Sequence, residues 1–307
     1  MRPVRNGLPR LRYLGPAGGR GGHALKHLIL RKRELSRENF LIEVAAPNVA
    51  ERFAPGQFVI IRIHDRGERI PLTVADVNRN DSSITLIFQV VGKTTRILSL
   101  MNPGDVLLNV VGPLGNPTEI QKWGRVVCVG GGTGIACVYP IIKALSRAGN
   151  TVLSIIGART KSLLLLEEKI RAVSAETFVT TDDGSLGEKG FVTDVLKNTI
   201  KKHNDGRDIS RVYVIGPPVV MKAAADVTRP FQIKTIVSLN TIMIDGTGMC
   251  GGCRVFIDGE MKLTCIDGPE FDAHKVDFDD VIGRLDMFKG KEKEAYACFL
   301  KQKDIHD

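Results

Sequence analysis

Between residues 28 and 116, short apolar segments alternate with turn residues. The segments are "LIEVAAP", "GQFVIIRI", "SSITLIFQVV" and "DVLLNVVGP", and Gly, Pro, Asn or Asp stand between them. They are rich in Val, Ile and Phe, which favour strands. Several short strands at this spacing are typical of a small antiparallel barrel. We therefore expect residues 26–118 to form a β barrel.

The hydrophobic pattern changes after Pro117, where apolar runs begin to alternate with amphipathic stretches. In "RVVCVGGGTGIACVYPIIKALSRAG" an apolar strand is followed by a glycine turn and a helix. "NTVLSIIGART" repeats the strand, "KSLLLLEEKIRAVSA" repeats the helix, and "TFVTTDDG" and "RVYVIGPP" add two strands. Strands alternating with helices indicate a parallel α/β sheet, which we expect over residues 119–230.

A third, smaller module is expected over residues 231–290, and it holds three of the six cysteines. Residues 291–307 follow as a charged tail. The predicted fold class is therefore an antiparallel barrel, a parallel-sheet α/β domain and a small C-terminal module. A chain of 307 residues is long enough for two or three domains.

The composition, with 43% hydrophobic and 25% charged residues, is that of a soluble globular protein. No apolar run reaches the roughly 18 residues of a membrane span, so we expect a cytoplasmic protein without a membrane partner. The net charge of +9 is partly local, because the first 25 residues contain five arginines and no acid. This Gly- and Pro-rich stretch, residues 1–25, is expected to be a disordered, dispensable extension, with a transit peptide as the alternative. The rest shows no basic–aromatic interleaving, which argues against a nucleic-acid partner.

The cysteine-bearing stretch "MIDGTGMCGGCRVFIDGEMKLTC" carries the strongest chemical signal. Plant-type iron–sulfur sites follow the order C-x₄-C-x₂-C with a distant fourth cysteine. Here Cys250 and Cys253 supply the x₂ pair and Cys265 the distant ligand, whereas the first position is Asp245. A carboxylate can ligate iron, so these four residues are the predicted ligands of a 2Fe–2S cluster. A structural zinc site formed by the three cysteines and His274 is the alternative.

The remaining cysteines carry no such signal. Cys128 and Cys137 flank a glycine run in an apolar context and are expected to be core residues, and Cys298 in the charged tail is left without a role.

A glycine-rich loop lies between the first parallel strand and its helix. Its residues are Gly130, Gly131, Gly132, Thr133 and Gly134. Backbone N–H groups and the helix dipole at such a position attract a pyrophosphate. The spacing departs from G-x-G-x-x-G because residue 135 is Ile, so a tight strand-to-helix turn remains the alternative.

Two polar segments of the barrel half carry groups that can hold a phosphate. They provide Arg69 in "GERIPLT" and Lys93, Thr94 and Thr95 in "VVGKTT". Charge together with hydroxyl or amide donors suits a phosphate. A polar hairpin without a ligand is the competing interpretation.

The combination of a barrel, a parallel α/β domain and a three-cysteine module resembles the ferredoxin–NADP reductase superfamily. "RIPLT" is similar to its Arg-x-Tyr-Ser/Thr flavin motif, and "GKTT", "GGGTGIA" and "GPP" are similar to its phosphate, nucleotide and nicotinamide segments. By this resemblance, Arg69 approaches the FAD pyrophosphate and Pro71, Leu72 and Thr73 line the isoalloxazine ring. Leu72 stands where many members have an aromatic residue. The resemblance further implies that FAD contacts Gly92, Lys93, Thr94 and Thr95, and that the nicotinamide nucleotide contacts Gly216 and Pro217.

Two subgroups of this superfamily carry a C-terminal 2Fe–2S module. The electron-transfer subunit of dihydroorotate dehydrogenase uses four cysteines, whereas the small subunit of NADH-dependent reduced ferredoxin:NADP oxidoreductase uses one aspartate and three cysteines. Asp245 favours the second. This resemblance implies FAD, a 2Fe–2S cluster and NAD(H) or NADP(H) as cofactors, and hydride exchange without a side chain acting as nucleophile or general base. It also implies a heterodimer with a larger FAD/iron–sulfur subunit, through which ferredoxin is reached indirectly.

Other functional hypotheses stay open at this point. They are the pyrimidine-pathway electron-transfer subunit, a flavin reductase with a structural zinc site, and an adaptor with a vestigial nucleotide site. The choice of nucleotide is open as well, because Arg159 can meet a 2′-phosphate or pair with Glu167 or Glu168. The resemblance favours NAD.

Overall fold

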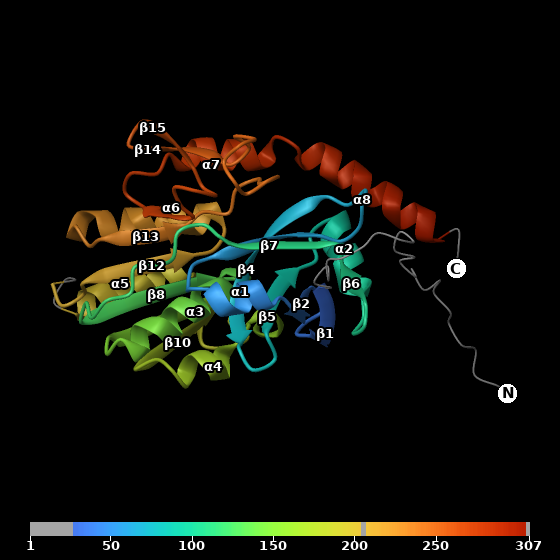
Figure 1. Cartoon of the computed structure of the whole chain (residues 1–307). Helices are drawn as coiled ribbons and strands as arrows, with labels where there is room; N and C mark the ends of the chain where they lie inside the picture. Colours follow the sequence, from blue (N-terminus) through green and yellow to red (C-terminus); the bar gives the residue numbers. More distant parts are fainter. Residues whose placement is uncertain (1–26, 204–206, 305–307) are drawn as a thin grey trace.

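The computed structural model describes residues 27–203 and 207–304. The extension predicted at residues 1–25 lies outside the described residues. The described chain forms two seven-stranded sheets and a two-stranded hairpin, with helices packed around the second sheet (Figure 1).

The first sheet is antiparallel throughout and has the strand order β6-β1-β2-β5-β4-β3-β7. Its strands are β1 (His27–Glu34), β2 (Asn39–Ala45), β3 (Phe58–Arg62), β4 (Arg69–Asn78), β5 (Ser83–Gln89), β6 (Val106–Leu107) and β7 (Asn109–Leu114). Helices α1 (Pro47–Arg52) and α2 (Lys93–Leu100) belong to this half. Leu108 joins the two edge strands β6 and β7, and its N–H donates to the carbonyl of Ile63, so the sheet nearly closes on itself. Alternating apolar residues fill its interior.

The second sheet has the order β11-β10-β9-β8-β12-β13-β16 and is parallel except for its last strand. Its strands are β8 (Arg125–Gly131), β9 (Thr151–Ala158), β10 (Glu176–Thr181), β11 (Glu188–Lys189), β12 (Arg211–Ile215), β13 (Thr235–Ser238) and β16 (Glu270–Asp272). The helices are α3 (Gly134–Arg147), α4 (Glu167–Arg171), α5 (Val192–Lys202) and α6 (Pro218–Thr228), with short 3₁₀ turns at Lys161–Leu163 and Arg229–Phe231.

The helices cover both faces of this sheet. Val127 and Val129 pack into the cluster of α5 and α6, whereas Val126 and Cys128 pack into that of α3 and α4. Because side chains alternate across a strand, β8 is buried on both faces, which explains its continuous apolar run. The placement of Cys128 in the core is confirmed.

From β8 the chain winds outward through β9 and β10 in one direction and through β12 and β13 in the other. Ligands of such sheets bind in the crevice outside the carboxyl ends of the strands at this reversal. The fold therefore places a candidate crevice between the ends of β8 and β12.

The C-terminal module contains the hairpin β14 (Arg254–Ile257) and β15 (Glu260–Leu263), with helices α7 (Phe278–Asp286) and α8 (Lys289–Asp304). The structure differs from the predicted boundary at residue 231, because β13 and β16 both belong to the second sheet. A four-residue strand next to a glycine-rich loop gives too little periodicity to separate it from that loop. The predicted charged tail contains most of α8, which lies against α2 (Figure 1).

The predicted fold class, a barrel followed by an α/β domain and a small module, is confirmed. None of the helices in the described part of the chain combines the length and the apolar character needed to span a bilayer.

Candidate functional site

The glycine-rich segment at the end of β8 lies at the sheet reversal, where the fold places the candidate crevice. Gly132 adopts φ +56°, and its N–H donates to the carbonyl of Gly157 at 2.8 Å. A Cβ added at Gly132 would meet nothing within 4 Å, and one at Gly131 would meet nothing closer than 3.7 Å. A Cβ at Gly134 would overlap the carbonyl oxygen of Ile215. Gly132 thus borders open space, Gly131 is buried beside Pro217 and Val220, and Gly134 permits close packing of α3 on β12.

The "GPP" segment lies directly beside this loop. A Cβ at Gly216 would be 3.4 Å from the Cα of Gly131, and Pro217 is exposed at the start of α6. The dipole of the 14-residue helix α3 gives its start a partial positive charge, although the N–H groups of Ile135 and Ala136 there already donate to the carbonyls of Gly132 and Thr133. The structure therefore brings together the two loops predicted to hold a nicotinamide nucleotide, and the crevice suits a pyrophosphate.

The barrel meets the nucleotide half along β4 and α3. Pro71, Leu72 and Thr73 are half-buried on β4, and Thr73 lies beside the thiol of Cys137 in the first turn of α3. Burial raises the pKa of Cys137. Cys137 packs against the core of the nucleotide half, as expected, and it is also a contact between the two halves. The apolar sequence around it gave no sign of this contact.

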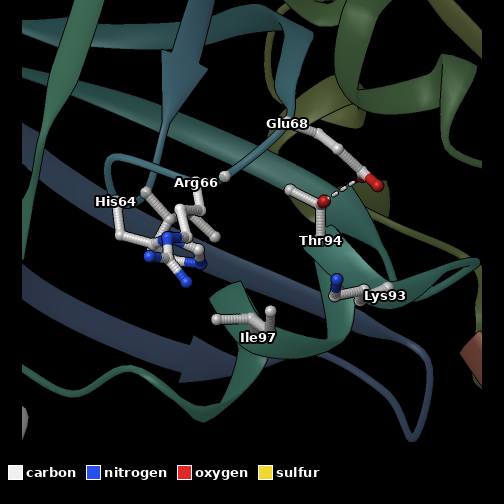
Figure 2. A pocket seen from close by; sticks show the side chains of 8 residues that line it. His64, Arg66, Glu68, Lys93, Thr94 and Ile97 are labelled. Atoms are coloured by element: carbon white, nitrogen blue, oxygen red, sulfur yellow. Dashed lines mark hydrogen bonds between the residues drawn. The ribbon is translucent and has the colours of Figure 1, made fainter. Parts of the chain in front are cut away.

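Figure 2 shows the pocket beside the first turn of α2, where the phosphate segment was predicted. Thr94 is buried, and its hydroxyl donates to the carboxylate of Glu68. The Thr95 hydroxyl accepts the N–H groups of Val91 and Gly92, both at 3.1 Å, and so caps the helix. Both threonine hydroxyls are therefore engaged within the protein, which leaves backbone groups and cations to meet a phosphate.

The cations that line this pocket differ in part from those predicted. Lys93 lies at the start of α2, and the basic residues Arg66 and His64 line the pocket from the segment before β4 (Figure 2). Arg69 is exposed at the start of β4 and is not among the lining residues. His64 and Arg66 were missed; the basic loop "HDRGER" before the flavin motif was the available signal.

The cysteine loop begins with a carboxylate that the backbone holds in place. Asp245 accepts the N–H of Thr247 at 2.8 Å and the N–H of Cys250 at 2.7 Å. These hydrogen bonds, that from Thr247 first, lower the pKa of Asp245. The carboxylate is thereby kept ionised and close to the backbone of Cys250.

The other two cysteines are buried together. The Sγ atoms of Cys253 and Cys265 are 3.2 Å apart, and no disulfide joins them. Burial, and next the neighbouring Cys253 thiol, raises the pKa of Cys265 to about 12. Both pack against Phe58 and Ile60 of β3 in a small apolar cluster. Paired buried thiols of this kind are suited to a metal, which would bind them as thiolates.

Positive-φ glycines shape the loop between these residues. A Cβ at Gly246 (φ +75°) would be 2.6 Å from Cδ1 of Ile60, and one at Gly248 (φ +85°) would overlap Ile266. Glycine at position 246 therefore lets the loop approach the barrel, and glycine at position 248 lets it pack against Ile266 of the same module. Cys250 is exposed, and within residues 27–203 and 207–304 no three His, Cys, Asp or Glu side chains already converge as a metal site.

His274, the ligand considered for a zinc site, is engaged elsewhere. Its Nε2 and the Thr228 hydroxyl of α6 form a hydrogen bond at 2.9 Å. Burial lowers the pKa of His274. The contacts of His274 therefore support packing of the module on α6 and not zinc ligation.

Arg159 follows β9 and contacts the barrel across the domain boundary. Its Nη2 lies 3.2 Å from Oε2 of Glu38, whereas Glu167, one of the partners considered for it, pairs with Arg171. Glu38 was not expected, because residues 38 and 159 have no local relationship in the sequence.

Comparison with known proteins places both predicted sites in recognised domains. The model of the oxidoreductase NAD-binding domain matches residues 128–226, which include the glycine loop, Arg159 and "GPP". The model of the iron–sulfur cluster binding domain of dihydroorotate dehydrogenase B matches residues 240–277, which include the cysteine loop.

Similar whole chains are known as well. A homologue of the electron transfer subunit of dihydroorotate dehydrogenase B (NAD⁺) from Thermotoga maritima is 45% identical over 92% of this chain and 98% of its own. A solved structure of NADH-dependent reduced ferredoxin–NADP oxidoreductase, described for flavin-based electron bifurcation, is 45% identical with a TM-score of 0.84 and covers 92% of this chain and 100% of its own. The electron transfer subunit from Desulforamulus reducens is 35% identical over 77% of this chain and 92% of its own.

These matches confirm the predictions of an oxidoreductase and of its cofactors, which are an iron–sulfur cluster, a nicotinamide nucleotide and a flavin. They also fit the nucleotide crevice and the buried cysteine pair described above. The chain belongs to the family of dihydroorotate dehydrogenase B electron-transfer subunits and their homologues.

Proposed function

We propose that this subunit exchanges hydride between NAD(H) and FAD and passes single electrons through a 2Fe–2S cluster to a larger flavoprotein partner. The observation that carries the proposal is the position of β3. Phe58 and Ile60 of β3 pack against Cys253 and Cys265. The same two residues are opposite Thr73 and Pro71 in the register of β3 and β4. One strand therefore separates the proposed flavin-ring segment from the proposed cluster ligands.

The ligand set we assign to the cluster is Asp245, Cys250, Cys253 and Cys265. It falls into two pairs, because Asp245 is hydrogen-bonded to the backbone of Cys250 and the Cys253 and Cys265 thiols are adjacent. Together they supply the four protein ligands that a 2Fe–2S cluster would take. Since Cys250 is exposed and flanked by Gly251 (φ +63°), closure of this short loop toward the buried pair would complete the site. One carboxylate and three thiolates form a donor set that iron accepts.

When bound, FAD would supply the interchange between hydride and single-electron chemistry. The role of the chain is to position the reactants. Pro71, Leu72 and Thr73 would border the ring, Lys93 and Gly92 the pyrophosphate, and Arg69 would approach it from β4. The Thr73–Cys137 contact holds the ring-lining strand against the first turn of α3, directly after the nucleotide loop. We assign the pyrophosphate of the nicotinamide nucleotide to residues 130–134, and its nicotinamide half to Gly216 and Pro217.

The partner surface we propose adjoins the cluster loop. A largely apolar cavity of about 230 Å³ lies between this loop and α7, and Ile244, Gly252 and Arg284 line it together with Met287 and Phe288. Ile244, Met287 and Phe288 are 55%, 58% and 43% exposed. Exposed apolar groups next to an electron-transfer centre suit a stable protein partner. That partner is the larger FAD/iron–sulfur subunit, which exchanges electrons with ferredoxin. The two subunits form a cytoplasmic heterodimer.

The decisive experiment is an anaerobic visible-absorption titration of the purified chain with NADH. Flavin bands and an iron–sulfur shoulder should both bleach as NADH is added. A flavin spectrum that bleaches without an iron–sulfur contribution, with zinc in metal analysis, would support a zinc-containing flavin reductase instead. A bound flavin that NADH does not reduce would favour an adaptor and contradict the proposal.

The electron-transfer subunit of a dihydroorotate dehydrogenase is the second candidate, because several relatives carry that description. Asp245 favours the ferredoxin-linked function, because the resemblance to the superfamily implies four cysteine ligands in the dihydroorotate dehydrogenase subunit. Purification of the native complex distinguishes the two: a dihydroorotate-oxidising chain bound to this subunit would establish the second candidate.

A further inference from the structure

Arg159 follows the strand that is hydrogen-bonded to the glycine loop. It is the first residue after β9, and the carbonyl of Gly157, two positions before it, accepts the N–H of Gly132 in the glycine loop. In dinucleotide-binding folds, an arginine in this region accommodates a 2′-phosphate, whereas an acid binds the ribose 2′-hydroxyl. The sequence of the α/β half alone would therefore suggest NADP(H).

The structure adds an acid from the other half of the molecule. Oε2 of Glu38, in the turn between β1 and β2, is 3.2 Å from Nη2 of Arg159. The same oxygen accepts Nε2 of Gln89 at 2.7 Å, and Oε1 of Gln89 accepts the hydroxyl of Thr133 at 3.4 Å. Glu38 is thus connected to the glycine loop itself through one intervening side chain.

The position of Glu38 is fixed by its own turn. The Ser36 hydroxyl accepts the N–H groups of Glu38 at 3.3 Å and of Asn39 at 3.1 Å, and the Asn39 side chain at 3.0 Å. Glu38 is therefore held at the crevice rather than carried there by a long, free loop. Asp183 is a further acid whose N–H donates to the Arg159 carbonyl at 3.3 Å. Its carboxylate is engaged by the hydroxyl and N–H of Ser185, at 2.6 and 2.9 Å.

We propose that Glu38 is the residue that determines nucleotide specificity, and that it makes the site select NAD(H) over NADP(H). This inference rests on the proposed function, since it concerns the same nucleotide site. A 2′-phosphate that approached Arg159 would meet the carboxylate already paired with it. Phosphate carries a charge of about −1.5 to −2, so like-charge repulsion would oppose binding. A ribose 2′-hydroxyl can instead donate a hydrogen bond to Glu38.

The test compares three chains: the wild type, Glu38→Gln and Glu43→Gln. Glutamine keeps the size of Glu38 and an oxygen for Gln89 but removes the charge. Glu43 is the matched control, because it is also a barrel glutamate paired with an arginine, Arg31 at 3.0 Å on the neighbouring strand β1. The ratio of kcat/KM for NADPH to that for NADH is measured from flavin reduction.

We expect Glu38→Gln to raise this ratio about tenfold, from the loss of one unit charge a few ångströms from a group of charge near −2. Glu43→Gln should leave the ratio within twofold of the wild type. In the double variant Glu38→Gln, Arg159→Gln the ratio should return toward the wild-type value, since the cation that attracts the phosphate is then absent. A ratio that changes less than twofold in Glu38→Gln would overturn the proposal.

Calorimetric binding of ADP-ribose and of its 2′-phosphate provides a readout that needs no hydride transfer. The same tenfold change in relative affinity is expected in Glu38→Gln. If the wild type binds ADP-ribose but NADH does not reduce its flavin, the proposed function fails while the affinity ratio still decides the role of Glu38. If the wild type binds neither analogue, both proposals fail.

Discussion

Ile60 of β3 is opposite Pro71 of β4 in the antiparallel register, and its side chain belongs to the apolar cluster around Cys253 and Cys265. The side chain is 2% exposed. Ile60 therefore forms part of the wall between the strand that we assign to the flavin ring and the thiols that we assign to the cluster. A change in the size of the Ile60 side chain should therefore affect the packing of both the flavin strand and the thiols.

Replacing Ile60 with alanine should destabilise the cluster module more than the flavin half. We expect an overall loss of about 2–5 kcal/mol from the cavity, together with a lower iron content per flavin. Iron and flavin analysis after gel filtration measures the ratio. Ile29→Ala is the control, because Ile29 is fully buried in the barrel core away from the cysteines. An unchanged iron-to-flavin ratio in Ile60→Ala would show that the wall does not support the cluster.

Changing Asp245 tests the proposed fourth ligand. Asp245→Cys should keep a cluster with a shifted absorption spectrum and reduction potential, because thiolate donates more electron density than carboxylate. Asp245→Ala should lose the cluster or bind it weakly, as it removes both the ligand and the acceptor for the N–H of Cys250. Visible spectra and redox titration provide the measurement. Asp258→Ala, at an exposed position of the same module, serves as the control. If Asp245→Ala retained the wild-type cluster, the fourth ligand would lie elsewhere.

Gly131→Ala should weaken nucleotide binding without unfolding the protein. The added Cβ would lie 3.7 Å from Pro217 and Val220, which the fold accommodates, but it would fill the space between the glycine loop and the "GPP" segment, both of which we assign to the nucleotide. We expect KM for NADH to rise by about tenfold or more, on the order of 1.4 kcal/mol of lost binding, with a melting temperature within a few degrees of the wild type. Gly283→Ala adds a Cβ on α7 where nothing lies within 4 Å and should change neither quantity. A normal KM in Gly131→Ala would exclude the loop as the pyrophosphate site.

Glu270 should make stability depend on pH. Its carboxyl accepts the Thr118 hydroxyl at 2.6 Å, and burial raises the pKa of Glu270 to about 7. Glutamate in an unfolded chain has a pKa of about 4.3, so the folded state keeps a proton that the unfolded state releases between these values. The free energy of unfolding therefore falls as the pH rises from about 4 to 7, and the full loss is reached above about pH 8.

Glu270→Gln removes this titration and keeps an oxygen for Thr118. The variant should be more stable than the wild type at pH 8, by up to about 3 kcal/mol, and similar to it at pH 5. Thermal unfolding at both pH values measures the difference, with the exposed Glu260→Gln as the control. Equal pH profiles for wild type and Glu270→Gln would mean that Glu270 is ionised in the fold throughout this range.

The parts of the molecule that could be predicted from the sequence are those specified by neighbouring residues. The apolar run of β8, its glycine turn and α3 are contiguous, and the x₂ spacing of Cys250 and Cys253 lies within one loop. The parts that were missed depend on contacts between distant segments. Glu38 meets Arg159 across 121 positions, and Cys137 meets Thr73 between two domains. The hydroxyls of Thr94 and Thr95 were assigned to a phosphate because their use within the protein, by Glu68 and by the backbone, becomes visible only when the loops are folded.

The pairing of β13 with β16 has a consequence for how this protein can be shortened. The chain leaves the sheet after β13, forms the cluster loop and returns as β16, which pairs with β13. At this junction the N–H of Leu239 donates to the carbonyl of Pro269 at 2.9 Å. A chain cut after Leu239 would lose β16 and leave the outer edge of β13 without hydrogen-bond partners. Such a bare, apolar edge is a template for pairing with other chains. Removal of the module should therefore yield an aggregating protein and not a minimal flavin reductase, because the segment that carries the cysteines also protects the sheet.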